Sequence, residues 1–142
     1  MKSGNRPSRP QALPRKTSNR LPAKAGVALK DFDYTEFRSI ADATPFSIAE
    51  WAVFLHLSER TLQRYAKSNG VFGGMQAERA LQIERLVKEG KQTLGSEKKF
   101  YQWLQSAPVT LEGSIGIESL SSNDGIQQVH IELKRIQHGL LA

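Results

Sequence analysis

Residues 47–70 carry the start and stop signals of two short helices, with a turn of only two residues between them. Ser47 and Glu50 have the spacing of a capping box, which predicts the start of the first helix. Ser58 is the expected N-cap of the second helix. Asn69-Gly70 is expected to end that helix in the left-handed region of backbone conformation. Two short helices joined so closely predict a helix-turn-helix.

The side chains between these helices fit such a motif. Ala52 is small enough to let the second helix approach the first, and His56 stands at the turn position that usually holds glycine. Histidine tolerates the left-handed conformation better than most residues, so it does not exclude the motif. The residues that the spacing turns toward the interior are Leu55, Leu57, Leu62, Tyr65 and Ala66.

The opposite face of the second helix is basic and polar, with Arg60, Thr61, Gln63, Arg64 and Lys67. Recognition helices present such side chains to the major groove of DNA. Arginine can donate two bonds to guanine, glutamine can pair with adenine, and lysine favours phosphate. Ser47 and Ser58, at helix N-termini, complete the predicted DNA-binding set. The alternative is an ordinary helical pair with a solvated basic face.

Helical spacing of apolar residues continues on both sides of this motif. One helix is expected between Tyr34 and Pro45, and a final helix is expected to be capped by Asn123 or Asp124 and to end at Gly139. Further helices are predicted at about 76–89, 97–106 and 117–120, with a break bracketed by Gly90 and Gly95. Only residues 128–133 are ambiguous between strand and helix. The sequence therefore predicts an all-α fold.

The charge is unevenly distributed along the chain. Residues 1–30 hold eight basic side chains and no acidic one, whereas the whole chain carries a formal charge of +6. This proline-rich arm has too few apolar residues to fold and is expected to be disordered. It either attracts phosphate or is a solvated tail. The predicted organisation is this arm, a helix-turn-helix domain over 31–92 and a small helical domain over 93–142.

Several classes of protein are disfavoured. There is no cysteine, so disulfides and thiolate metal sites are excluded. The three histidines are scattered, and no phosphate loop or nucleophile motif occurs. No apolar run approaches the roughly 20 residues that cross a bilayer, and the N-terminus lacks the apolar segment of a secretory signal. We expect a cytoplasmic, non-enzymatic protein without a metal or cofactor.

The last third of the chain carries an ordered series of small and apolar landmarks. They are Leu94-Gly95, Phe100, Trp103-Leu104, Pro108, Leu111, Gly113, Leu120, Gly125, Val129, Leu133, Ile136 and Gly139. This series follows a helix-turn-helix along the chain. It resembles the toxin-binding domain of Xre/ParS/MbcA antitoxins, the neutralising partners of RES-domain toxins. The resemblance covers about residues 36–142. The sequence departs from the family pattern at Ile115-Gly116 and at Ser122.

The resemblance implies two partners. It implies a homodimer that binds operator DNA to regulate its own operon. It also implies that the C-terminal helix and its tail cover the active site of a cognate RES-domain toxin, an enzyme that degrades NAD⁺. Carried over by position, the implied toxin-binding residues are Leu111, Gly113, Leu120, Leu133, Ile136, Gln137, His138, Gly139 and Leu140.

Physical chemistry alone leaves other interpretations open. Most of the apolar landmarks, among them Phe100 and Leu133, are expected to be core, because a small helical domain needs them to close. The apolar residues 139–142 either contact a partner or fray. The alternative function is a stand-alone helix-turn-helix regulator whose C-terminal domain dimerises or senses a ligand.

Overall fold

The computed structural model describes residues 31–139, and most of these residues lie in helices. The predicted basic arm and Leu140 lie outside the described residues. The elements are α2 (Tyr34–Asp42), α3 (Ile48–Leu55), α4 (Glu59–Ser68), α5 (Gly74–Leu94), α6 (Glu97–Gln105), β2 (Val109–Thr110), β3 (Gly113–Ser114), the 3-10 helix η3 (Ile117–Ser121) and α7 (Asn123–Gln137). The all-α prediction is confirmed, and the ambiguous residues 128–133 are helical.

Serine side chains start four of the helices by accepting a hydrogen bond from the backbone N–H three residues on, which would otherwise lack a partner. They are Ser47, Ser58, Ser96 and Ser122. The prediction that Asn123 or Asp124 caps the last helix is wrong. Ser122 has extended backbone, and its Oγ lies 2.9 Å from the N–H of Gly125.

The predicted helix break at Gly90 is also wrong, because α5 continues through this glycine to Leu94. Gly90 is buried, and a side chain there would overlap the ring of Phe100. The glycine therefore permits the close approach of α6 rather than interrupting α5. Gly95, with φ of 108°, does end the helix in the left-handed region.

A small hairpin, β2–β3, was not predicted. Val109 pairs with Ser114 and Thr110 pairs with Gly113 in an antiparallel register. Thr110 Oγ1 donates to the carbonyl of Gly113 at 2.6 Å, which fixes the turn. Each strand has only two residues, so no alternating pattern could reveal it. Within residues 31–139 this is the one sheet.

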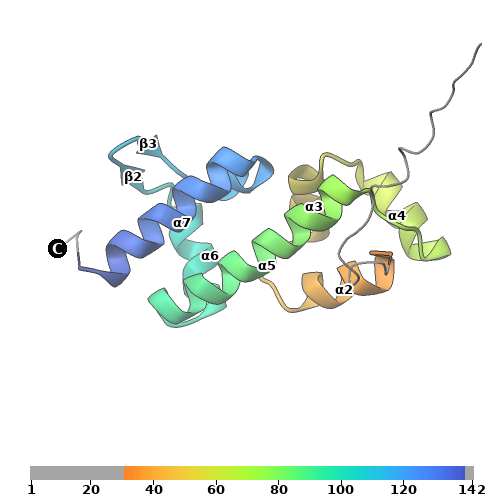
Figure 1. Ribbon diagram of the computed structural model, residues 1–142, viewed down its shortest axis with the longest axis horizontal. Helices are drawn as coiled ribbons and strands as arrows, with labels where there is room; N and C mark the ends of the chain where they lie inside the picture. The colour runs from red at the N-terminus through yellow and green to blue at the C-terminus, as the bar shows by residue number, and fades with distance from the viewer. Residues whose placement is uncertain (1–30, 140–142) are drawn as a thin grey trace, which may run out of the picture. The chain divides into compact units, whose positions relative to one another are not determined.

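Helix α5 lies at the centre of the fold and packs against α2, α3, α6 and α7 (Figure 1). Its first half contributes Ala80 and Ile83 to the core, which also contains Trp51, whose ring meets that of Phe37 edge-on at 5.3 Å between ring centres. Farther along, its buried residues join Phe100, Leu104 and Leu133 in the same continuous core. Residues 32–139 belong to one compact unit, so the segments before and after residue 92 share a core.

Candidate nucleic-acid interface

Helices α3 and α4 are joined by the turn that the sequence predicts. His56 adopts the left-handed conformation, with φ of 58° and ψ of 42°. The N–H of Leu57 bonds the carbonyl of Ala52 at 2.9 Å, and the N–H of His56 bonds that of Val53 at 3.1 Å. These bonds satisfy carbonyls at the end of α3 and turn the chain directly into α4.

The interior of the motif is largely as predicted. Ala52, Leu55 and Leu62 are buried, and Leu57 and Tyr65 pack against the core from its edge. The prediction that Ala66 points inward is wrong, because Ala66 is exposed. In this half of α4 the inward contact is made by Tyr65, whose ring meets that of Phe72 at 4.9 Å.

Four of the predicted DNA-binding side chains form one exposed face of α4. Arg60, Gln63, Arg64 and Lys67 are all exposed, and their spacing of three and four residues places them on the same side of a helix. None of the three cations forms an ion pair with another described residue. The face therefore presents uncompensated positive charge and a carboxamide to solvent.

The predicted hydroxyl donors have structural roles as well. Ser47 accepts from Glu50 N–H at 3.1 Å and keeps its own hydroxyl proton for a further acceptor. Ser58 accepts from Thr61 N–H and donates to Thr61 Oγ1, both at 3.0 Å. That arrangement leaves the half-buried Thr61 hydroxyl as the remaining donor at the N-terminus of α4.

The end of α4 and the turn between α3 and α4 are held by contacts that the sequence did not reveal. Asn69, the left-handed C-cap of α4, accepts at Oδ1 from the N–H and hydroxyl of Thr35, and donates from Nδ2 to Asp33. At the turn, His56 Nε2 lies 2.8 Å from the carbonyl of Ser121. Arg79 donates to that carbonyl at 2.7 Å and to the carbonyl of Phe54 at 3.1 Å.

This geometry agrees with the comparison of the chain with known proteins. Residues 15–85, half of the chain, match the family model described as the antitoxin Xre-like helix-turn-helix domain. The chain belongs to this family of antitoxins. No curated protein matches the chain.

Membership makes this chain a DNA-binding antitoxin of the Xre type, with α3 and α4 as its helix-turn-helix. The matched residues contain α2, α3, α4 and the first part of α5. They end before the hairpin and α7, so the match does not identify what the C-terminal part binds.

The C-terminal residues assigned to a partner occupy two different environments in this antitoxin. Leu120 and Leu133 have exposed fractions of zero and belong to the core, so neither side chain is presented at the surface. Each is needed to join α7 and η3 to the rest of the molecule. Leu111, by contrast, is 84% exposed on the turn of the hairpin.

The other members of that set lie at the surface. Gly113 is exposed on β3, Ile136 is half-buried near the end of α7, and Gln137, His138 and Gly139 are exposed. Leu140 lies outside the described residues. The assigned toxin-binding residues that solvent can reach therefore lie in two places, the tip of the hairpin and the end of α7.

Glutamate side chains hold both of these segments, the end of α7 and the hairpin, in position. Glu89 accepts from His130 at 2.6 Å, from Lys134 at 3.2 Å and from Gln137 at 3.2 Å, which ties the end of α7 to α5. Burial raises the pKa of Glu89, but the hydrogen bonds from His130, Lys134 and Gln137 outweigh burial and hold the pKa below its ordinary value of 4.5.

Arg135 links the hairpin to α7 in a similar way. Its Nη1 lies 3.1 Å from Oε1 of the buried Glu132 and 3.6 Å from Oε1 of Glu112, which follows Leu111 in the hairpin turn. A buried carboxylate that keeps its charge needs such a partner. The pair therefore orients Arg135 toward the hairpin.

Residues 31–139 contain no helix that is long and apolar enough to cross a membrane. Nor do they contain a group of three or more histidine, aspartate or glutamate side chains placed to hold a metal ion.

Proposed function

We propose that this antitoxin has two binding surfaces: the exposed face of α4 binds operator DNA, and the hairpin tip with the end of α7 binds and neutralises a RES-domain toxin. The observation that carries the DNA-binding half is the row of Arg60, Gln63, Arg64 and Lys67 on the second helix of a helix-turn-helix, without ion-pair partners among the described residues.

The DNA surface assigns a different task to each side chain. Arg60 and Arg64 donate to guanine edges, and Gln63 pairs with adenine. Lys67, farther along α4, contacts phosphate. The hydroxyls of Ser47, Ser58 and Thr61 lie at helix N-termini, where backbone N–H groups also attract phosphate. We infer that the protein acts as a homodimer, because a two-fold dimer reads two half-sites of an operator.

Two observations support the toxin surface. Its side chains are exposed to solvent, and residues 36–142 resemble RES-associated antitoxins. Leu111 is a large apolar side chain held in solvent by a hydrogen-bonded turn. Val109 of the same hairpin is also 83% exposed, and exposed apolar side chains that gather on one surface mark interaction sites. The end of α7, with Ile136, Gln137 and His138, covers the toxin's active site and keeps NAD⁺ out.

The test is a pair of measurements on the full chain. Fluorescence anisotropy with duplex DNA from its own promoter should show binding at least tenfold tighter than to a duplex of unrelated sequence. In cells that express the RES-domain toxin, co-expression of this chain should restore NAD⁺. Promoter binding without restoration of NAD⁺ would leave a stand-alone regulator and overturn toxin neutralisation. Equal affinity for both duplexes would overturn operator recognition.

A further inference from the structure

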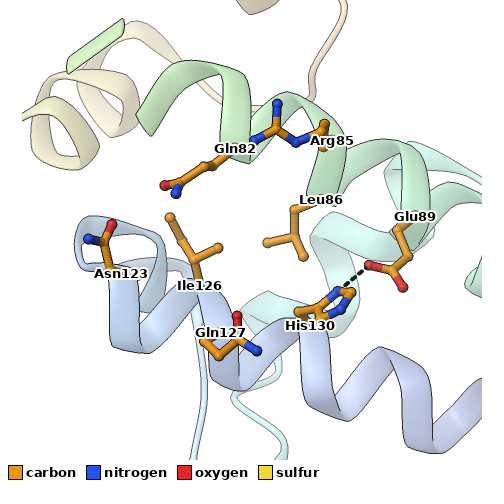
Figure 2. A pocket seen from close by; sticks show the side chains of 8 residues that line it. All are labelled: Gln82, Arg85, Leu86, Glu89, Asn123, Ile126, Gln127 and His130. Atoms are coloured by element: carbon orange, nitrogen blue, oxygen red, sulfur yellow. Dashed lines mark hydrogen bonds and ion pairs between the residues drawn. The ribbon is translucent and has the colours of Figure 1, made fainter. Parts of the chain in front are cut away.

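A groove runs between α5 and α7, on a surface that neither the α4 face nor the hairpin tip uses. It consists of two adjoining hollows of about 470 and 410 Å³, which share Arg85, Glu89 and His130. Figure 2 shows the first hollow, with α5 on one side and α7 on the other. Leu86 and Ile126 face each other across its middle.

Five carboxamide side chains contribute to the polar lining of this groove. Gln82, Asn123 and Gln127 line the first hollow, and Gln92 and Gln137 line the second. A carboxamide has both donor and acceptor atoms; Gln137 uses its own on Glu89, Thr93 and Lys134, and Asn123 Oδ1 accepts from Arg79. Such side chains match the N–H and C=O groups of an extended peptide, which also alternate as donors and acceptors.

One of these carboxamides lacks a partner. Gln82 Oε1 is shielded from solvent and forms no hydrogen bond with any described residue. Figure 2 shows its amide group reaching from α5 toward Asn123 at the end of the groove. A shielded acceptor without a donor is unusual in a native protein. Rotation of this side chain into the groove would bring the oxygen to a backbone N–H of a bound segment, which would supply that donor.

The charge of the groove is positive. Its carboxylate, Glu89, already accepts from His130 and Lys134. Arg85 and Lys88 are exposed on α5 and have no ion-pair partner among the described residues. Two uncompensated cations therefore remain, and they favour acidic groups in whatever occupies the groove.

We propose that the groove between α5 and α7 binds an extended, acidic peptide segment of the toxin. This inference rests on the proposed function for the identity of the partner. The groove leads from Asn123 to Gln137, the full length of α7, which is roughly 21 Å of helix or about six extended residues. It ends at Gln137, which is also one of the residues assigned to toxin binding, so the groove is continuous with the proposed toxin surface.

The test compares two charge reversals that change the net charge equally. Arg85→Glu/Lys88→Glu reverses the groove, and Lys98→Glu/Lys99→Glu reverses two exposed cations of α6 that do not line it. The groove variant should weaken binding of the purified RES-domain toxin at least tenfold, and the α6 variant by less than twofold. Equal binding by both variants and the unchanged chain would overturn the proposal.

A third variant separates recognition from folding. Gln82→Met removes the unpartnered acceptor, so the melting temperature should stay the same or rise while toxin binding weakens severalfold. Unchanged binding would contradict the role of this carboxamide.

A direct probe does not depend on the toxin. Hexaglutamate added to the full chain should shift the side-chain amide resonances of Gln82, Asn123 and Gln127, whereas duplex DNA should not. Failure of the unchanged chain to bind the toxin overturns the proposed function, and the hexaglutamate titration then decides the groove alone. If hexaglutamate leaves these resonances in place, or duplex DNA moves them equally, the groove is not a site for acidic peptide.

Discussion

His130 Nδ1 lies 2.6 Å from Glu89 Oε1, and this contact joins two helices across 41 residues of sequence. A carboxylate can only accept, so Nδ1 of His130 carries the proton. Lys134 and Gln137 reach the other oxygen of Glu89, and Gln137 also bonds Thr93 Oγ1 at 2.6 Å. One side chain of α5 thus positions the last two turns of α7.

Replacing Glu89 should therefore loosen the end of α7. Glu89→Ala leaves three donors of α7 without their acceptor, and we expect it to lower the free energy of unfolding by about 1–3 kcal/mol. The matched control is Glu78→Ala, an exposed glutamate of α5, which should change it by less than about 0.5 kcal/mol. Urea unfolding measures both values, and equal effects would show that Glu89 is not an anchor.

The same residue should make stability depend on pH. The pKa of Glu89 is lower in the folded protein than its ordinary value of 4.5. Its ionised form therefore stabilises the fold above the unfolded pKa, and this stabilisation is lost as the pH falls through the folded pKa. The difference in unfolding free energy between the unchanged chain and Glu89→Gln should shrink as the pH is lowered from about 6 to about 3. A difference that stays constant over this interval would contradict this assignment.

Two substitutions on α4 should have different effects on DNA binding. Arg64→Ala should weaken promoter binding by about 1–3 kcal/mol and relax base preference at one position. Lys67→Ala should weaken binding to all sequences alike and reduce the slope of log K against log salt by about one. Lys91→Ala, an exposed lysine of α5, is the control and should change neither. Anisotropy over a salt series tests this, and equal loss of base preference in both α4 variants would oppose the assignment.

Gly90 should resist replacement although it lies inside a helix. Alanine is favoured over glycine in a helix by about 1 kcal/mol, but a side chain at residue 90 overlaps the ring of Phe100. Overpacking of this kind costs about 1–3 kcal/mol, so Gly90→Ala should destabilise the protein on balance. Gly74→Ala is the control, because nothing lies within 4 Å of the added carbon. Thermal unfolding should place Gly90→Ala below the unchanged chain and Gly74→Ala at or above it.

Local signals account for the part of the fold that the sequence predicted. Ser47 with Glu50, and Ser58 with Thr61, are separated by three residues, so the helix starts can be read from spacing. His56 could be placed at the turn because few side chains tolerate its left-handed backbone. The exposed face of α4 followed from the helical period once Leu62 was assigned to the core.

Several features that the sequence did not predict depend on contacts distant in sequence. Gly90 can be recognised as part of a helix only if the position of Phe100 is known. Arg79 bonds Ser121 across 42 residues, and no pattern within α5 indicates it. The resemblance assigned Leu120 and Leu133 to toxin binding, but their place in the core is sufficient to explain why they are apolar.

The most direct measurement of toxin neutralisation is the rate at which the purified RES-domain toxin degrades NAD⁺ in the presence of each variant. The unchanged chain should abolish the activity at equimolar concentration. Leu111→Asp places a charge on the hairpin tip and should raise the concentration needed for inhibition at least tenfold. Met75→Asp, at a residue that is 81% exposed outside the proposed surface, should inhibit like the unchanged chain. Equal inhibition by both variants, or no inhibition by the unchanged chain, would contradict the account.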